Sequence, residues 1–490
     1  MPPTLTQPTV AVAGGGLAGL AAACALSDAG FRVTLFEKRP FLGGRASSWE
    51  HPGTGEVVDN CQHVLFRLCT NLMEFYHRIG VTDQIRWYDE MTFIEPGGRT
   101  SMMKSSPLPA PLHTAPSFWQ FKFLSASDKL SISRALIPLT LTKQRDTGQS
   151  FQHWLDQHGQ TKHAVERFWR PILVSALSEE LDLISTSAAA QVIRMSMMSP
   201  AARHMGVPTV PLTDLYNKAG DYIRARGGTL HFREPIEGFT ANGSQAKLHL
   251  RNQEENQQKE AAGAPFFPRS SREVGDFDFL VLALPFDALD RVLPHTPESA
   301  SLREQLSHFE TSPITGIHLW FDRQISDLDH AVLLDRTIQW MFHKSRLQPI
   351  RTQPNNGAPA GSYIELVVSS SKTLIDKSRA EIVDLALKEV REFFPSAREA
   401  NLVKSTVIKE LNATYSPRPG IDAHRPVATT AWPRVFLAGD WTATGRPATM
   451  EGAVRSGYLA AETLARAAGR NDSSFLSPDL PATGLMRIFS

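Results

Sequence analysis

The stretch at residues 10–30, VAVAGGGLAGLAAACALSDAG, constrains the fold of this chain more than any other. A short apolar run leads into Gly14, Gly16 and Gly19, spaced G-x-G-x-x-G, and an alanine-rich segment follows. Gly14 permits a tight turn, Gly16 lets a pyrophosphate approach the backbone, and Gly19 lets the helix lie close to the strand. The pattern predicts a dinucleotide-binding turn in which the first N–H groups of the helix face a phosphate.

A second strand is expected at residues 32–36, and it ends at Glu37, 23 residues after Gly14. A carboxylate at about this spacing accepts hydrogen bonds from ribose hydroxyls. An acid here favours an unphosphorylated ribose, so NADP is not expected as the tightly held nucleotide. A signal peptide would also explain the uncharged run 9–27, but residues 1–9 carry no Lys or Arg, which excludes that interpretation.

The chain has 490 residues, which is too long for one simple core and indicates two interleaved domains. Its formal net charge is +1, so no bulk field points to a nucleic-acid partner. No other stretch approaches ~20 uncharged apolar residues, and no transmembrane helix is expected. Cys24, Cys61 and Cys69 form no C-x-x-C pair; they indicate a reducing cytosol, with no disulfide and no metal site.

A second glycine-rich segment follows Glu37 at residues 41–48, FLGGRASS. Gly43 and Gly44 allow close backbone approach, and Arg45 offers a planar cation to the pyrophosphate. With the first glycine loop and the acid, this arrangement resembles flavoproteins of the amine oxidase and phytoene desaturase type. The resemblance implies FAD as the cofactor. In similar flavoproteins the strand that contains Ile236 continues past the adenine, which makes Ile236 a candidate backbone contact.

The last motif, at residues 435–457, is VFLAGDWTATGRPATMEGAVRSG. A buried strand leads to Gly439 and Asp440, and a helix is expected to begin near Pro447, because proline suits the first helical position. In the flavoproteins that it resembles, the acid contacts the ribityl and diphosphate region and the helix N-terminus, with Met450, faces the flavin. The partial positive charge there, about half an elementary charge, stabilises an anionic reduced flavin.

The segment 57–65, VVDNCQHVL, resembles the squalene-associated FAD-dependent desaturases, the hydroxysqualene dehydroxylases of hopanoid-producing bacteria, whose pattern is close to DNGQHVL. Cys61 stands where that family has glycine. The resemblance extends over essentially the whole chain. It implies reductive loss of the hydroxyl of hydroxysqualene to give squalene, with hydride delivered from N5 of reduced FAD to an allylic carbon.

His63 is the first candidate for the proton donor of this reaction and Tyr415 the second. A hydrogen-bonded structural histidine is the alternative interpretation of His63. Cys61 could be a redox thiol, but a buried free cysteine is the commoner case.

Two other functions compete with dehydroxylation. One is oxidative desaturation of a carotenoid precursor, or related amine oxidase-like flavoenzyme chemistry, and the other is a non-catalytic FAD-holding scaffold in an isoprenoid assembly. The expected partners are the long isoprenoid substrate, hydroxysqualene, other squalene-pathway enzymes and a transient electron donor. No second nucleotide loop is apparent, so NADPH or a reductase must meet the flavin transiently.

Aromatic residues gather within the proline-punctuated segment 91–141, where Phe118, Trp119, Phe121 and Phe123 lie close to lysines. This composition suits a membrane–water interface and equally suits an ordinary cap on the substrate domain. We expect a cytoplasmic protein, with peripheral contact to the inner face of the cytoplasmic membrane as an open alternative.

Together these patterns predict an α/β fold, in which a Rossmann-like FAD-binding domain is interleaved with a mixed-sheet and helical substrate domain. The expected ranges are 1–90, 231–300 and 426–470 for the FAD-binding domain, 91–230 and 301–425 for the substrate domain, and 471–490 for a loose tail. Residues 228–239 are expected as one strand, and residues 251–275 and 353–361 as polar loops.

Overall fold

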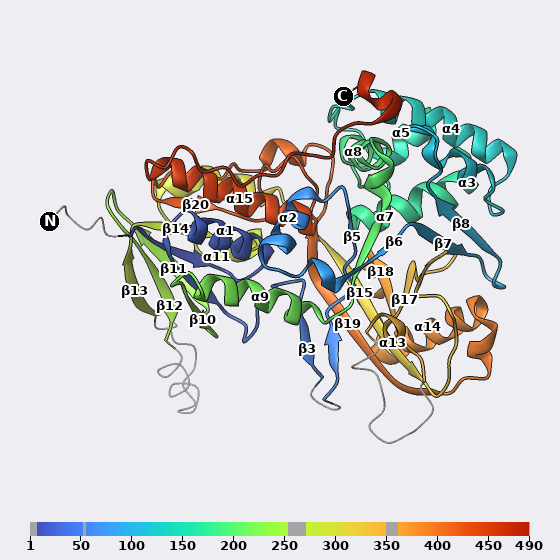
Figure 1. Ribbon diagram of the computed structural model, residues 1–490, viewed down its shortest axis with the longest axis horizontal. Helices are drawn as coiled ribbons and strands as arrows, with labels where there is room; N and C mark the ends of the chain where they lie inside the picture. Colours follow the sequence, from blue (N-terminus) through green and yellow to red (C-terminus); the bar gives the residue numbers. More distant parts are fainter. Residues whose placement is uncertain (1–6, 52–54, 253–270, 349–360, 490) are drawn as a thin grey trace.

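The glycine-rich stretch lies at the centre of a five-stranded parallel sheet (Figure 1). In spatial order the strands are β10 (Thr229–Phe232), β2 (Arg32–Glu37), β1 (Thr9–Ala13), β14 (Phe279–Leu282) and β20 (Val435–Leu437). The computed structural model describes residues 7–51, 55–252, 271–348 and 361–489. Both ends of the chain therefore contribute strands to one sheet, and the predicted α/β fold is confirmed.

Alternating side chains bury both faces of this sheet. Val10 and Val12 belong to a core shared with helices, whereas Ala11 and Ala13 belong to a core on the other face. The first face is covered by α1 (Leu17–Asp28), α9 (Leu212–Arg224) and α15 (Met450–Ala467), with α2 (Thr70–Arg78) packed on α15. The other face is covered by the antiparallel sheet β11 (Ile236–Ala241), β12 (Ala246–Arg251) and β13 (Ser271–Phe277), and by α11 (Phe286–Val292) and α12 (Ala300–Ser307).

A seven-stranded mixed sheet forms the second lobe of the molecule (Figure 1). Its strands, in spatial order, are β19 (Leu402–Tyr415), β15 (Thr311–Phe321), β18 (Tyr363–Ser369), β17 (Trp340–His343), β16 (His330–Leu333), β7 (Glu90–Ile94) and β8 (Thr100–Lys104). Helix α14 (Arg379–Phe393) packs on one face.

A helical layer packs on the other face of this sheet. It consists of α3 (Ala115–Trp119), α4 (Ala126–Leu141), α5 (Phe151–Gln157), α6 (Lys162–Ala164), a π-helical turn (Val165–Trp169), α7 (Arg170–Leu177) and α8 (Thr186–Met197). A small sheet joins the two lobes, with β9 (Met205–Pro208) between β5 (Leu65–Phe66) and β6 (Ile85–Tyr88). The hairpin β3 (Ser48–Glu50) and β4 (Val57–Asp59), the short helix α13 (Lys344–Leu347) and several 3₁₀ turns complete the described chain.

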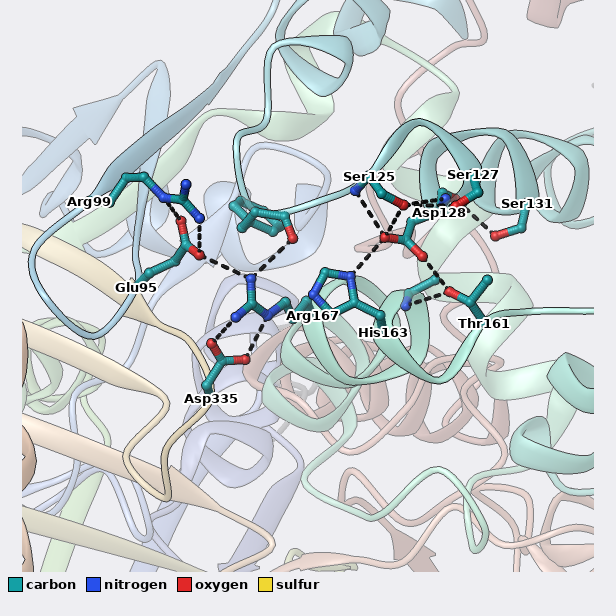
Figure 2. Close-up of polar contacts among 12 residues, drawn as sticks. Glu95, Arg99, Ser125, Ser127, Asp128, Ser131, Thr161, His163, Arg167 and Asp335 are labelled. Carbon is teal, nitrogen blue, oxygen red and sulfur yellow. Dashed lines mark hydrogen bonds and ion pairs between the residues drawn. The ribbon is translucent and has the colours of Figure 1, made fainter.

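Two polar networks hold the helical layer in place (Figure 2). Arg167 on the π-helical turn donates to Glu95, which follows β7, at 3.0 Å and to Asp335, beyond β16, at 2.5 Å. Asp128 in α4 forms a capping box with Ser125 and also accepts from Thr161, 2.5 Å away, in the residue before α6. The first network attaches the layer to the sheet, and the second joins its helices to one another.

Several local predictions are corrected by the structure. The single strand expected at residues 228–239 is divided into β10 and β11, which belong to different sheets, and Arg233 between them has a φ of +59°. Part of the loop expected at 251–275 is strand β13, because its backbone pairs with β12; residues 253–270 and 349–360 lie outside the described residues. Helix α9, placed within the substrate range 91–230, packs on α1 of the parallel sheet.

The predicted loose tail is also wrong, because most of it is attached to both lobes. Asp479 pairs with Arg446 in the segment before α15, and Thr483 donates its backbone N–H to the carbonyl of Met198 at 3.0 Å. Met486 is fully buried. The tail therefore crosses from the parallel sheet to the helical layer, beside which the C-terminus lies in Figure 1. Across the described part of the chain, we find no helix that is both long and apolar enough to span a bilayer.

Candidate active site

Two glycine loops form the floor of the candidate site. Gly14 has a φ of +110°, and a Cβ there would lie 2.5 Å from the carbonyl oxygen of Ala283. Gly44 has a φ of +61°, and a Cβ there would lie 2.9 Å from the Cα of Gly16. Gly19 lies so close to the turn that a Cβ would be 2.0 Å from the Gly14 carbonyl oxygen. Larger residues would be strained at these positions, so the floor presents bare backbone to a ligand.

Glu37 ends β2 beside this floor and is 6% exposed. Its Oε2 accepts the backbone N–H of Gly15 at 2.7 Å, and its Oε1 accepts that of Arg39 at 2.8 Å. An ionised carboxylate has about four acceptor sites, so Glu37 can still accept from ribose hydroxyls. The existing bonds orient the carboxylate for that purpose.

An ion pair joins the second glycine loop to the last motif. Arg45 donates to Asp440 at 2.7 Å and to the carbonyl oxygen of Ala413 at 2.7 Å. Burial disfavours the charged guanidinium, but the Asp440 carboxylate outweighs this effect and raises the pKa of Arg45. The site therefore keeps a fixed cation beside the glycine floor.

Helix α15 directs its N-terminus at the same cavity. The helix begins at Met450 and not near Pro447, because the side chain of Thr449 caps it by accepting the backbone N–H of Gly452 at 3.1 Å. Pro447 and Met450 both line the cavity. The positive end of the helix macrodipole is thus available to a negatively charged group.

One cavity of about 1000 Å³ connects the glycine floor with the substrate lobe. Its far walls are apolar side chains of the helical layer and of the mixed sheet, among them Phe118, Leu136, Ile172, Trp340 and Phe342. A cofactor bound on the glycine floor would therefore face the apolar part of the cavity.

Most of the residues expected at the site lie on the wall of this cavity: Gly14, Gly16, Glu37, Gly44, Arg45, His63, Ile236, Gly439, Asp440 and Met450. Gly19 lies behind the turn that it packs against. Tyr415 is 2% exposed and lies behind the Arg45–Asp440 pair, where it lines a separate small cavity with both of them. The structure does not bring the Tyr415 hydroxyl to the main cavity.

A buried lysine anchors the loop that carries the DNCQHVL motif. Lys344 is 1% exposed, and its Nζ donates to Asp59 at 2.5 Å and to the side-chain oxygen of Gln62 at 2.8 Å. Lys344 belongs to the lobe with the seven-stranded sheet, whereas the loop follows the hairpin β3–β4, which packs on α9 of the parallel-sheet lobe. This interaction fixes Cys61 and His63 against the cavity.

Glu365 lies on the other side of Lys344, 3.5 Å away, and is fully buried. Burial, partly offset by the charge of Lys344, raises the pKa of Glu365 to about 7. One lysine thus faces two carboxyl groups, of which Asp59 is the ionised one, because its pKa is lowered by Lys344 despite burial.

His63 lies on the cavity wall as a neutral imidazole. Its Nδ1 is 2.6 Å from the carbonyl oxygen of Cys61, so Nδ1 carries the proton and Nε2 has the lone pair. Burial lowers the pKa of His63 below its usual value. This form suits a hydrogen-bond or proton acceptor better than the proton donor predicted from the sequence.

The three cysteines are free, and Cys61 is a buried thiol. Burial is the largest cause that raises the pKa of Cys61 well above its usual value, so the thiol stays protonated. A protonated thiol is a poor nucleophile, which favours the structural interpretation of Cys61 over the redox one.

Sequence reasoning missed Lys344 and Glu365. Glu365 is the only charged residue within the apolar strand YIELVVS, and a lone charge in such a run needs a buried partner. That signal predicts a partner without identifying it, because Lys344 lies on a different element.

Comparison with known proteins agrees with this geometry. The family model described as flavin containing amine oxidoreductase matches residues 17–465. The chain is 26% identical to a 15-cis-phytoene desaturase of Synechococcus elongatus, over 93% of this chain and 95% of that protein. It is 28% identical to a probable zeta-carotene desaturase of the same species, over 94% of this chain and 98% of the relative.

A solved structure of putrescine oxidase bound to putrescine has the same fold. The TM-score is 0.68 at 15% sequence identity, and the match covers 94% of this chain and 98% of the other. FAD is the cofactor that the family implies, and the site fits it: the bare backbone floor suits a pyrophosphate, Glu37 a ribose, and the N-terminus of α15 a flavin ring.

We predict that Gly14→Ala yields protein with little or no FAD. The new Cβ would meet the Ala283 carbonyl oxygen at 2.5 Å on backbone with a positive φ, which displaces the floor. Gly243→Ala is the matched control, because a Cβ there meets nothing within 4 Å. The ratio of flavin absorbance to protein, measured after purification, should fall several-fold for Gly14→Ala only; equal ratios for the two variants would contradict the assignment.

We also predict that Glu365 makes the protein less stable as the pH rises from about 5 to 7. The folded state holds a proton on Glu365 up to about pH 7, whereas the unfolded chain loses it near pH 4.5, so rising pH favours unfolding in this window. Relative to Glu365→Gln, the wild type should lose about 1.4 kcal/mol per pH unit. Urea unfolding of both proteins at each pH measures the difference, and parallel stability curves would show that Glu365 titrates normally.

Proposed function

The chain belongs to the flavin containing amine oxidoreductase family and is an FAD-dependent oxidoreductase, and from this premise we propose that it reductively removes the hydroxyl of hydroxysqualene to give squalene. The observation that carries the proposal is the apolar cavity that opens directly from the glycine floor. Such a chamber suits a long hydrocarbon chain bound against a flavin.

The DNCQHVL motif supports the dehydroxylase interpretation. Its residues Asn60, Cys61, Gln62, His63 and Val64 all line the cavity, where they can contact a substrate or the cofactor. In our proposal, the motif that carries the resemblance to hydroxysqualene dehydroxylases therefore forms part of the reaction site.

In the proposed reaction the allylic C–O bond breaks, the carbon gains a hydride, and the oxygen leaves as water after taking a proton. Bound and reduced FAD supplies the hydride. The apolar walls exclude water, so that the electron-poor carbon meets hydride before solvent. NADPH or a reductase restores the reduced cofactor, and other squalene-pathway enzymes supply the substrate.

His63 remains our candidate for proton exchange, in a modified role. Its Nε2 lone pair can take up a proton and pass it to the leaving oxygen, whereas the neutral form at rest has no proton to give at that atom. Tyr415 is not in a position to donate the proton, because it lines the separate small cavity and not the main one.

Carotenoid desaturation is the second candidate, because the two relatives from Synechococcus elongatus are a 15-cis-phytoene desaturase and a probable zeta-carotene desaturase. It would use the same cavity and cofactor with electrons moving from substrate to flavin. The two functions differ in the redox state of the flavin that reacts.

The deciding experiment is anaerobic. We expect dithionite-reduced holoenzyme to regain oxidised flavin absorbance on addition of hydroxysqualene and to form one equivalent of squalene, identified by mass spectrometry. Failure to reoxidise, together with bleaching of the oxidised enzyme by phytoene, would assign the protein to the desaturases.

Peripheral membrane contact is also proposed, with a corrected set of residues. Phe118, Phe121 and Phe123 are at most 7% exposed and belong to the core of the helical layer. Leu112, Trp119 and Ile137, by contrast, are 47%, 51% and 59% exposed and line the cavity. Apolar side chains at an opening into an apolar cavity suit the inner face of the cytoplasmic membrane, from which an isoprenoid could enter.

We predict that replacing Leu112, Trp119 and Ile137 together with serine reduces co-sedimentation with anionic liposomes several-fold. The matched control replaces Val403, Leu411 and Val427 with serine, because these are equally exposed apolar residues that do not line the cavity. Sedimentation that is unchanged, or reduced equally in both triple variants, would remove the proposed membrane surface.

A further inference from the structure

Arg203 differs from the other arginines on the cavity wall. Five of them make contacts that satisfy their charge or their donors: Arg39 with the Gly44 carbonyl, Arg45 with Asp440, Arg251 with Glu237, Arg291 with Asp287, and Arg446 with Asp479. Arg203 makes no hydrogen bond or ion pair with any residue that the structure describes. One guanidinium on this wall is thus left without an acceptor.

Among the described residues, no carboxylate forms an ion pair with Arg203. The residue ends the 3₁₀ turn Pro200–Arg203, between α8 and β9, and is partly buried. His113, on the segment before α3, is fully buried, and within the described chain neither of its ring nitrogens has a hydrogen-bond partner. Burial and the charge of Arg203 lower the pKa of His113 to about 4, so His113 is neutral beside the cation.

Arg203 is only partly buried, so its N–H groups can still meet water in the empty cavity. Loss of that water without a replacement acceptor would be costly. Burial lowers the pKa of Arg203 to about 10, which still leaves it charged at neutral pH. A hydrocarbon ligand would remove more water without offering an acceptor. A ligand with an oxygen atom would satisfy the donors.

We propose that Arg203 binds the hydroxyl oxygen of the substrate, so that the cavity selects a long isoprenoid alcohol over the corresponding hydrocarbon. The choice of an isoprenoid as the ligand rests on the proposed function. The contact between Arg203 and a hydroxyl oxygen, by contrast, can be measured by ligand binding alone. A guanidinium N–H that donates to the hydroxyl oxygen also holds that oxygen, and with it the adjoining carbon, at one place in the cavity.

This contact gives direction to the mainly apolar end of the cavity. The walls around Arg203 come from the helical layer, and apolar walls hold a hydrocarbon chain without fixing its register. One charged donor sets the register by fixing the oxygen. Loss of the hydroxyl as water would remove the acceptor and favour release of the hydrocarbon product.

The test compares ligands that differ by one oxygen. Equilibrium dialysis of the oxidised holoenzyme measures the binding of radiolabelled farnesol, a C15 isoprenoid alcohol, and of farnesene, a C15 isoprenoid hydrocarbon. Arg203→Met, which keeps an unbranched apolar stem and removes the guanidinium donors, should weaken farnesol binding by roughly 10- to 150-fold, the loss of one hydrogen bond to a charged group. Farnesene binding should change by less than about 2-fold.

Two controls separate this role from a structural one. Arg134→Met removes an exposed arginine of α4 that is not on the cavity wall, and it should leave the affinity for both ligands unchanged. FAD content and the flavin spectrum of Arg203→Met should match the wild type. Altered FAD binding in the absence of ligand would show that Arg203 serves the cofactor and would overturn the proposal.

Other outcomes are equally decisive. Equal weakening of farnesol and farnesene would show a packing defect, and an unchanged affinity for farnesol would show that the hydroxyl lies elsewhere. If palmitate binding depends on Arg203 while farnesol binding does not, the guanidinium serves a carboxylate, and the proposal is wrong. The binding test involves no turnover, so its result is independent of the proposed reaction. Arg203 could select alcohols even if hydroxysqualene is not the substrate. Conversely, the protein could dehydroxylate hydroxysqualene even if Arg203 does not bind the hydroxyl.

Discussion

The Arg45–Asp440 ion pair is the contact on which the site depends, because it joins parts of the chain that are almost 400 residues apart in sequence. The first part supplies the glycine floor and Glu37, and the second supplies β20 and the N-terminus of α15. Neither part encloses a dinucleotide alone. A fixed cation and a helix N-terminus on the same wall also make the cavity locally favourable to anions, as a pyrophosphate and a reduced flavin require.

The end of the cavity that lies in the second lobe differs from the glycine floor in its chemistry. Its walls are apolar, and their placement depends on polar contacts at the periphery, where Arg167 attaches the helical layer to the mixed sheet and Lys344 attaches the DNCQHVL loop. These anchoring charges lie behind the walls, and most of the wall that would contact a hydrocarbon chain consists of side chains that make no directional bonds. Directionality is confined to the few polar groups that reach the cavity surface.

The sequence predicted the FAD-binding half well, because its motifs have fixed spacing. Gly14 and Gly16 must be glycine for backbone reasons, and Glu37 must end the neighbouring strand, so local sequence determines their geometry. The rest depends on contacts between distant segments that carry no spacing signal. Lys344 and Glu365 meet only through the order of strands in the mixed sheet, and Tyr415 was misplaced because residues on one strand can face different cavities.

The crossing of the C-terminal tail has a consequence for biosynthesis. Helix α15 covers part of one face of the parallel sheet, and the tail segment bonds to the carbonyl of Met198. Both lie in the last tenth of the chain. The apolar walls, which come from earlier residues, therefore leave the ribosome before the cofactor chamber can close, and they stay accessible to water and to other nascent chains until then. A flavin can therefore be fully enclosed only after α15 and the segment up to Met486 have been synthesised.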